Sequence, residues 1–310
     1  MRTHSLHCLG PRGFHRIVYR EWGNPASRHV VVCVHGLTRN GRDFDYLARA
    51  LARRCRVICP DVVGRGDSDW LENKEDYGFT LYQSDAAACI ARVTASAAGL
   101  FARLKGLIGL RGEVQLDWVG TSMGGLIGLM LAAQSNSPVR RLILNDVGPI
   151  VPWAGLLRIK GHVTKATRFG NREEAEAYVR EVCATFGPLS DAAWRHLSEH
   201  SVRRNEDGSL RLAYDPGISS AAALRGEFSL QLWRQTLFGM DLWSVWDKVR
   251  CPTLALRGSQ SDLLLAETAA EMQRRGPRAK VVEFPGVGHA PALMSKDQIR
   301  AVSEFLFADD

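Results

Sequence analysis

Short apolar runs alternate with longer amphipathic segments through the first half of the chain. The apolar runs predict β-strands at His15–Glu21, His29–His35, Val57–Pro60, Glu113–Val119 and Arg141–Asn145. The segments between them have the apolar spacing of helices, at Phe44–Arg54, Leu81–Ala98 and Met123–Gln134. Nearly continuous apolar strands separated by helices indicate a mostly parallel central sheet with helices on both faces.

This alternation stops at about residue 150 and returns at about residue 247. Between these points the sequence predicts helices at Glu173–Thr185, Asp191–His200 and Leu230–Leu237, and a polar loop at Arg203–Pro216. Beyond them it predicts strands at Pro252–Arg257 and Lys280–Phe284, and helices at Ala266–Arg275 and Lys296–Phe307. We therefore expect an α/β core in two parts, residues 1–149 and 247–310, interrupted by a helical cap at residues 150–246.

The most informative motif is Gly120-Thr121-Ser122-Met123-Gly124, at a predicted strand-to-helix junction. A serine there lies on a tight turn that exposes its hydroxyl, and side chains two positions away on either side would collide, so glycine is required. The start of the following helix directs amide groups and partial positive charge at developing negative charge. The alternative is an ordinary helix-capping serine. The flanking apolar strand and helix favour Ser122 as a nucleophile.

A His-Gly turn, His35-Gly36, ends an earlier apolar strand and is followed by Leu37. In this position, the backbone amide that follows the turn can face the nucleophile. Together with the amide of Met123 it would form an oxyanion hole with two donors.

A base and an acid are expected after the nucleophile, in the chain order Ser, acid, His. His289 lies in a glycine-rich loop after the last predicted strand, and we interpret it as the base. Two aspartates are candidates for the acid. Asp262 follows the strand at Pro252–Arg257, and we favour it because it lies one strand closer to His289. Asp146 ends the preceding strand, and its alternative role is that of a structural residue that binds backbone amides.

Five motifs occur in a fixed order: the His-Gly turn, DVVGRGDSD, GTSMGG, RGSQSD and GVGHAP. Together they resemble the α/β-hydrolase superfamily over roughly residues 14–150 and 245–308. More narrowly, HGLTRNGRDF, DVVGRGDSDW and LILNDVGP resemble bacterial carboxylesterases that include polyester and hydroxyalkanoate-oligomer hydrolases. The resemblance implies an α/β-hydrolase fold and ester hydrolysis without metal or cofactor. Its implied site is Ser122 as nucleophile, His289 as base, Asp262 as acid, and Leu37 and Met123 as oxyanion donors.

Other functions are compatible with parts of this pattern. A C–C bond hydrolase of the meta-cleavage type uses the same triad, and a catalytically silent binding protein could share the fold. Epoxide hydrolysis and dehalogenation normally need an aspartate where this chain has Ser122. The loop that contains Gly64 and Gly66 is expected at the carboxyl rim of the sheet, where ligands bind, but Asp69 breaks the dinucleotide-binding pattern.

Composition limits the setting. The seven cysteines form no CxxC pair, and the beginning of the chain has no apolar signal segment, so we expect free thiols and a cytoplasmic location. The longest apolar run, Leu126–Ala133, is much shorter than the roughly 20 residues of a membrane span, so no stable membrane insertion is expected. The net charge of +7 is spread along the chain rather than striped, which predicts no nucleic-acid partner. The expected partner is a small-molecule or oligomeric ester, and a homo-oligomer is compatible with the sequence.

Two segments have less defined roles. Residues 95–112 are longer than the usual connection before the nucleophile and keep helical apolar spacing, so we expect them to pack on the core or a partner subunit, with a lipid or polyester surface as the alternative. In the cap, the apolar residues Trp153, Leu156 and Leu157 are expected to face the cleft and set ester specificity.

Overall fold

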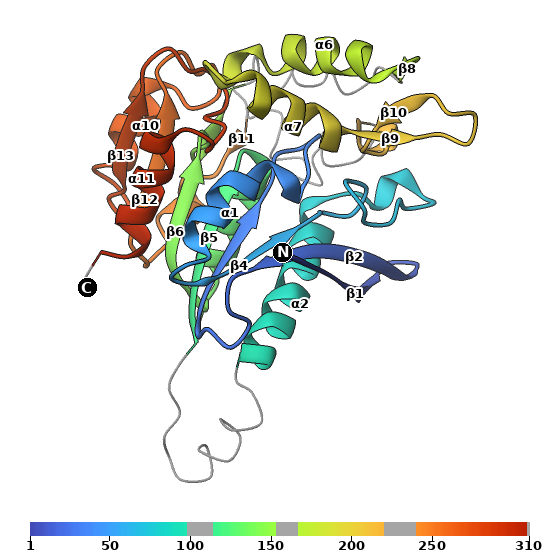
Figure 1. Cartoon of the computed structure of the whole chain (residues 1–310). Helices are drawn as coiled ribbons and strands as arrows, with labels where there is room; N and C mark the ends of the chain where they lie inside the picture. The colour runs from blue at the N-terminus through green and yellow to red at the C-terminus, as the bar shows by residue number, and fades with distance from the viewer. Residues whose placement is uncertain (98–113, 153–166, 220–239, 309–310) are drawn as a thin grey trace.

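In the computed structural model, eight strands form one sheet in the order β1-β2-β4-β3-β5-β6-β12-β13 (Figure 1). The structure describes residues 1–97, 114–152, 167–219 and 240–308. Strands β1, β2 and β4 pair antiparallel, whereas all neighbours from β4 to β13 pair parallel. The strands are β1 (Arg2–Gly10), β2 (Gly13–Trp22), β3 (His29–Val34), β4 (Arg56–Pro60), β5 (Gln115–Thr121), β6 (Val139–Asn145), β12 (Thr253–Gly258) and β13 (Lys280–Phe284).

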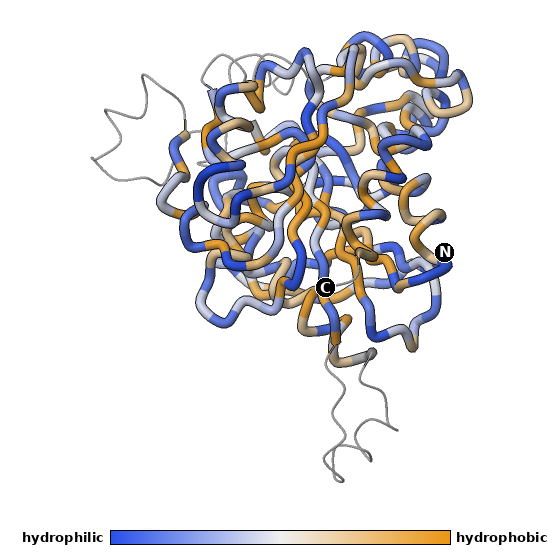
Figure 2. Tube along the Cα trace, turned by 90° about the vertical axis from the view of Figure 1, so that its left-hand side faces the viewer, coloured by the Kyte–Doolittle hydropathy of each residue, from blue (hydrophilic) through white to orange (hydrophobic). Residues whose placement is uncertain are grey.

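The two faces of this sheet are covered by different helices. Alternate residues of a strand point to opposite faces, and in β3 the side chains of Val31 and Cys33 join one apolar cluster while Val30 and Val32 join the other. The first cluster includes α1 (Asp45–Leu51) and α11 (Lys296–Leu306), and the second includes α2 (Phe79–Ala97), α4 (Met123–Ala132) and α10 (Ala266–Met272). Apolar residues gather along the central strands (Figure 2). The predicted fold class is confirmed.

The sheet begins with a strand that the sequence did not predict. β1 pairs with β2 along its whole length, from Arg2 opposite Glu21 to Gly10 opposite Gly13. It lies at the edge of the sheet, and most of its residues are exposed or partly exposed. An edge strand of this kind has no buried apolar run, so a search for such runs does not find it.

The described residues between β6 and β12 include a small layer in which α6 and α7 lie beside one another (Figure 1). Helix α6 (Arg172–Val182) begins after Asn171 and helix α7 (Asp191–Ser201) after Ser190, and each of these residues accepts an amide hydrogen bond from the first turn. The predicted loop at Arg203–Pro216 is wrong in part, because β9 (Val202–Arg204) and β10 (Leu210–Leu212) pair there, with β8 (Arg168–Phe169) beside β10. Such short strands leave little sequence signal.

The two ends of this segment meet. β7 (Ile150–Val151) pairs antiparallel with β11 (Met240–Asp241), so the chain leaves the core and returns to it at neighbouring positions. The predicted limits of the cap, residues 150–246, stay a prediction. The remaining elements are η1 (Gly41–Phe44), η2 (Lys74–Asp76), η3 (Ala184–Phe186), η4 (Pro216–Ser219) and α9 (Trp243–Trp246).

Several expectations fall on residues outside the described ones. These are the predicted helix at Leu230–Leu237, the cap residues Trp153, Leu156 and Leu157, and residues 98–112 of the longer connection. All seven cysteines lie within the described part and are free thiols, six of them buried, as predicted. Within the same residues, the structure contains no helix with the length and apolarity that a membrane span requires.

Candidate active site

Ser122 occupies a sharp turn between β5 and α4. Its φ of 51° lies in the positive range that non-glycine residues rarely adopt. The turn is held by the Ser122 amide, which donates to the carbonyl oxygen of Asn145 at 3.0 Å, and by the Ser122 carbonyl, which accepts from the Gly125 amide at 2.8 Å. The Ser122 side chain makes no capping hydrogen bond to α4, so it is not an ordinary helix cap.

The neighbouring glycines are required by close backbone contacts. A Cβ atom on Gly120 would lie 2.2 Å from the carbonyl oxygen of Gly124, and one on Gly124 would lie 2.0 Å from that of Val34. Both distances are far below van der Waals contact. The requirement for glycine on both sides of the serine is therefore confirmed.

Ser122 and His289 are brought together as predicted, although β5 and the loop after β13 are far apart in sequence. The Ser122 hydroxyl lies 3.0 Å from Nε2 of His289, and Nδ1 of His289 lies 2.8 Å from Oδ2 of Asp146. Because the carboxylate accepts from Nδ1–H, Nε2 carries the lone pair and accepts from the hydroxyl. Ser122 and Asp146 are buried, and the His289 side chain is 11% exposed.

The carboxylate at His289 is Asp146, which corrects our placement of Asp262 there. The sheet order explains the difference: β6 lies directly beside β5, so Asp146, after β6, is next to the turn at Ser122. Asp262 follows β12, one strand further from β5, and is exposed. Proximity along the chain to His289 was therefore the wrong criterion.

The loop after β12 still contributes to the site, because it orients Asp146. The amide of Gly258 donates to Oδ1 of Asp146 at 2.8 Å, and the hydroxyl of Ser261 donates to Oδ2 at 2.6 Å. With His289, three donors surround a carboxylate that is fully buried. The alternative role considered for Asp146, binding backbone amides, is thus also present.

The loop that carries His289 is held from two sides. In η3 of the cap segment, the hydroxyl of Thr185 donates to the His289 carbonyl at 2.6 Å, and the backbone carbonyl of Thr185 accepts from the Gly288 amide at 2.7 Å. From the core, the Asn145 side-chain amide donates to the Pro291 carbonyl at 2.8 Å. The position of the imidazole thus depends on the cap segment as well as on the sheet.

The His-Gly turn lies against the nucleophile, since a Cβ atom on Gly36 would be 3.7 Å from Cβ of Ser122. His35 donates from Nδ1 to the Gly36 carbonyl at 2.7 Å and accepts the Val62 amide at Nε2 at 3.0 Å. Burial lowers the pKa of His35 to about 4, so the imidazole that holds this turn is neutral. Within the described residues, the amide of Leu37 donates no hydrogen bond, and it stays the predicted partner of Met123 in an oxyanion hole.

A buried arginine that the sequence analysis did not select contacts both predicted oxyanion residues. Arg65 is fully buried; its Nε donates to the Leu37 carbonyl at 2.8 Å and its Nη2 lies 3.7 Å from the Met123 sulfur. It also donates to the Val63 carbonyl and the Tyr82 hydroxyl. No carboxylate in the described part of the chain forms an ion pair with it. The position of Arg65 between two glycines in the rim loop is its only sequence signal.

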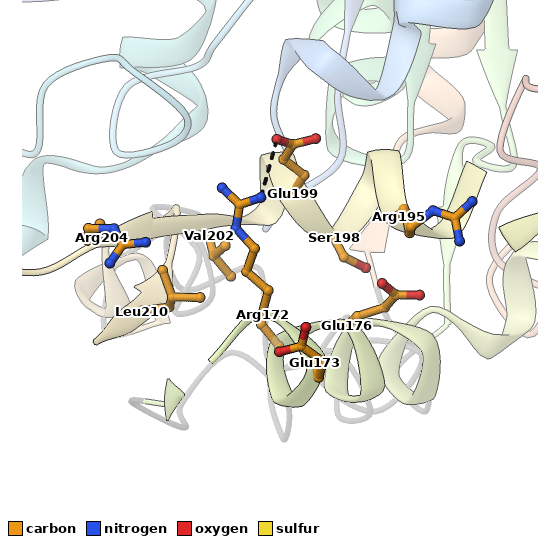
Figure 3. A pocket seen from close by; sticks show the side chains of 10 residues that line it. Arg172, Glu173, Glu176, Arg195, Ser198, Glu199, Val202, Arg204 and Leu210 are labelled. Atoms are coloured by element: carbon orange, nitrogen blue, oxygen red, sulfur yellow. Dashed lines mark ion pairs between the residues drawn. The ribbon is translucent and has the colours of Figure 1, made fainter. Parts of the chain in front are cut away.

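A hollow of about 310 Å³ lies in the cap segment, between α6, α7 and the β9–β10 hairpin (Figure 3). Arginine and glutamate side chains dominate its lining, and Arg172 forms an ion pair with Glu199 at 3.9 Å. None of the residues that line it belongs to the group around Ser122. It is therefore separate from the candidate active site.

Known proteins of one family are similar to this chain over nearly its whole length. A model of the alpha/beta hydrolase family matches residues 31–302. The chain is 40% identical over 314 residues to a 3-hydroxybutyrate-oligomer hydrolase from Cupriavidus necator, which covers 98% of this chain and 97% of the relative. It is 28% identical to a 2-(acetamidomethylene)succinate hydrolase from Mesorhizobium japonicum, over 91% of this chain and 89% of the relative. A solved alpha/beta hydrolase from Novosphingobium aromaticivorans superposes with a TM-score of 0.80 at 32% identity and covers 98% of both chains.

Proposed function

The chain belongs to the alpha/beta hydrolase family, and we propose that it is a serine carboxylesterase that cleaves esters of hydroxyacids, including hydroxybutyrate oligomers. One observation carries the proposal: Ser122, His289 and Asp146 form a continuous hydrogen-bonded row at a strained turn. A hydroxyl placed this way has a base within reach, and the base has an oriented carboxylate behind it.

Each residue then has a defined role. His289 accepts the proton of Ser122 as the hydroxyl oxygen attacks the ester carbonyl, and Asp146 stabilises the imidazolium that forms. The amides of Leu37 and Met123 donate to the oxyanion. His289 returns the proton to the leaving alcohol, and a water molecule, activated by the same base, releases the acyl group.

Two features support hydroxyacid esters as substrates. The relative from Cupriavidus necator is 40% identical over nearly the whole of both chains and is named for hydroxybutyrate oligomers. The chain also carries a net charge of +7. Cleavage within such an oligomer produces a new carboxylate at each step, and a positive field attracts carboxylate-bearing chains more than neutral triglycerides.

The proposed location is the cytoplasm, because the seven cysteines, all within the described residues, are free thiols as in reducing compartments.

The substrate class is tested by initial rates on four compounds: a 3-hydroxybutyrate trimer, p-nitrophenyl butyrate, a long-chain triglyceride and a coloured meta-cleavage product with a scissile C–C bond. The Ser122→Ala variant is the matched control for each. We expect cleavage of the trimer and the butyrate ester, and no signal from the variant. Cleavage of the butyrate ester alone would indicate a general carboxylesterase that does not act on hydroxybutyrate oligomers. Preference for the C–C substrate would replace the proposal, and no turnover of any compound would indicate a binding protein.

A further inference from the structure

Three side chains of types that can bind metals lie close together where the cap segment contacts the core. Asp45 begins α1 of the core, and His196 and His200 lie on α7 of the cap segment. One ligand atom from each residue lies within 4.8 Å of the other two. The two histidines are four residues apart, so they project from the same side of the helix. This pair faces the core, where the ring of His196 packs edge-on against Tyr46.

Asp45 has a carboxylate oxygen that no described residue satisfies. Its side chain is 2% exposed, and Oδ2 accepts from Nε of Arg42 at 2.7 Å. Oδ1 is buried and has no hydrogen-bond partner among the residues that the structure describes. A buried polar atom without a partner is unfavourable, and such atoms are rare in folded proteins. Oδ1 is therefore available to a ligand, whereas Oδ2 is already bound by Arg42.

The two imidazoles are suited to complete such a site. The ring of His200 is partly buried and packs edge-on against that of His196, with 4.6 Å between the ring centroids. Nε2 of His196 lies 3.5 Å from Oδ2 of Asp45 and donates to the Arg42 carbonyl at 3.1 Å, so the lone pair of this ring is at Nδ1. Neutral imidazole is the form that binds metals.

We propose that Asp45, His196 and His200 bind a divalent transition metal of the zinc type, separate from the candidate active site. Two imidazole nitrogens and one carboxylate oxygen are a ligand set preferred by zinc, whereas calcium and magnesium prefer oxygen alone. The ion would join α7 to α1. It would reinforce two contacts already present beside it: Asn40 donates to the His200 carbonyl at 2.7 Å, and Arg39 donates to the Ser201 hydroxyl at 2.7 Å.

A second cluster, Cys8, His15 and Asp85, is less suited to a metal. Nε2 of His15 already lies 3.0 and 2.9 Å from the two oxygens of Asp85. Burial and the charge of Asp85 raise the pKa of the Cys8 thiol to about 12, and metals bind the thiolate. Nε2 of His15 and the Asp85 carboxylate are thus already paired in the core, although Nδ1 of His15 has no hydrogen-bond partner among the described residues, and the cluster provides a control for the experiment.

Zinc binding is measured by calorimetry on the full chain, freed of metal by a chelator and carrying no histidine tag. We expect one equivalent of zinc and a rise in melting temperature on its addition, because a ligand that binds only the folded state stabilises it. Cobalt should bind at the same site and give the visible absorption of a four-coordinate ion. His200→Ala and Asp45→Asn should each weaken zinc binding at least tenfold. His7→Ala, an exposed histidine on β1, and Cys8→Ser should bind as the unaltered chain does.

Arg42→Gln gives a test in the opposite direction. It removes a positive charge next to the site and releases Oδ2 of Asp45, so zinc should bind several-fold more tightly. Circular dichroism of each metal-free variant checks that it is folded. Any one of three results would overturn the proposal. These are an unchanged zinc affinity in both His200→Ala and Asp45→Asn, a loss of zinc affinity only in Cys8→Ser, and no increase in zinc affinity in folded Arg42→Gln. The test measures zinc affinity and not ester turnover, so a failure of the proposed function does not decide whether the zinc site exists.

Discussion

Replacement of Asp146 by asparagine is expected to abolish most of the turnover while the chain still folds. Asparagine has the same shape, and its carbonyl oxygen can keep the hydrogen bond from the Gly258 amide. The amide nitrogen then takes the place of Oδ2, where it is a donor facing Nδ1 of His289. Nδ1 must therefore accept, the ring proton moves to Nε2, and His289 no longer accepts a proton from Ser122.

The size of the effect follows from this change of tautomer. In a serine protease the equivalent substitution costs about 10⁴ in kcat, which corresponds to about 5.4 kcal/mol in the activation free energy. Folding should suffer less: the hydroxyl of Ser261 loses its acceptor at 2.6 Å, and an unmatched buried group costs about 1–3 kcal/mol. Asp262→Asn is the matched control, since Asp262 is exposed after β12, and its kcat should fall less than about tenfold.

The assay is kcat and KM for p-nitrophenyl butyrate in both variants, with melting temperatures measured in parallel. We expect the loss in Asp146→Asn to lie in kcat. If Asp262→Asn loses more turnover than Asp146→Asn while both stay folded, the contact between Asp146 and His289 is not the catalytic one and our reasoning is refuted.

Three further predictions concern residues around the site. Gly124→Ala places a methyl group 2.0 Å from a carbonyl oxygen of β3 and should lower the free energy of unfolding in urea by about 3 kcal/mol or more. Gly78→Ala, with open space at that position, should change this free energy by no more than about 0.5 kcal/mol, and equal losses in the two variants would contradict the requirement for glycine at residue 124. Arg65 contacts both oxyanion residues, so Arg65→Met should lower kcat about tenfold with KM little changed, which is less than the 10²–10³ lost with a direct oxyanion donor. Arg65→Lys should restore part of kcat, and a change in KM alone would contradict the role of Arg65 in positioning Leu37 and Met123. The pKa of His35 is about 4 in the folded chain, and its ordinary value is 6.5. Between pH 6.5 and pH 4 the unfolded chain therefore binds a proton that the folded chain does not, and the free energy of unfolding falls by on the order of 3 kcal/mol. Urea unfolding at pH 7 and pH 4.5 should show a smaller fall in His35→Gln than in the unaltered chain, and an equal fall would contradict the assignment.

The sequence predicts the turn at Ser122 because its requirements are local. A strand, a helix and glycines at fixed positions are all visible within about twenty residues, and the close contacts of Gly120 and Gly124 explain the spacing. The position of His289 follows from chain order and a glycine-rich loop. Alternation of apolar runs and helices likewise predicts the parallel part of the sheet.

The acid could not be chosen in the same way, because the choice depends on the order of strands in space. Chain order places both Asp146 and Asp262 between Ser122 and His289, and only the sheet shows that β6 lies beside β5. Arg65 was missed for a related reason. Its contacts with Leu37 and Met123 join residues 28 and 58 positions away, and no local pattern reports them.

The central claim, that Ser122 is the nucleophile of a hydrolase, is tested most directly by a fluorophosphonate label. The reagent forms a covalent bond only with an activated serine, so the labelled residue identifies the nucleophile. The chain and its Ser122→Ala variant are treated alike, and the modified peptide is identified by mass spectrometry. We predict one label, on Ser122, loss of ester turnover in proportion to labelling, and no label on the folded variant. A label on a different serine, or a variant that is still labelled and still turns over, would contradict the claim.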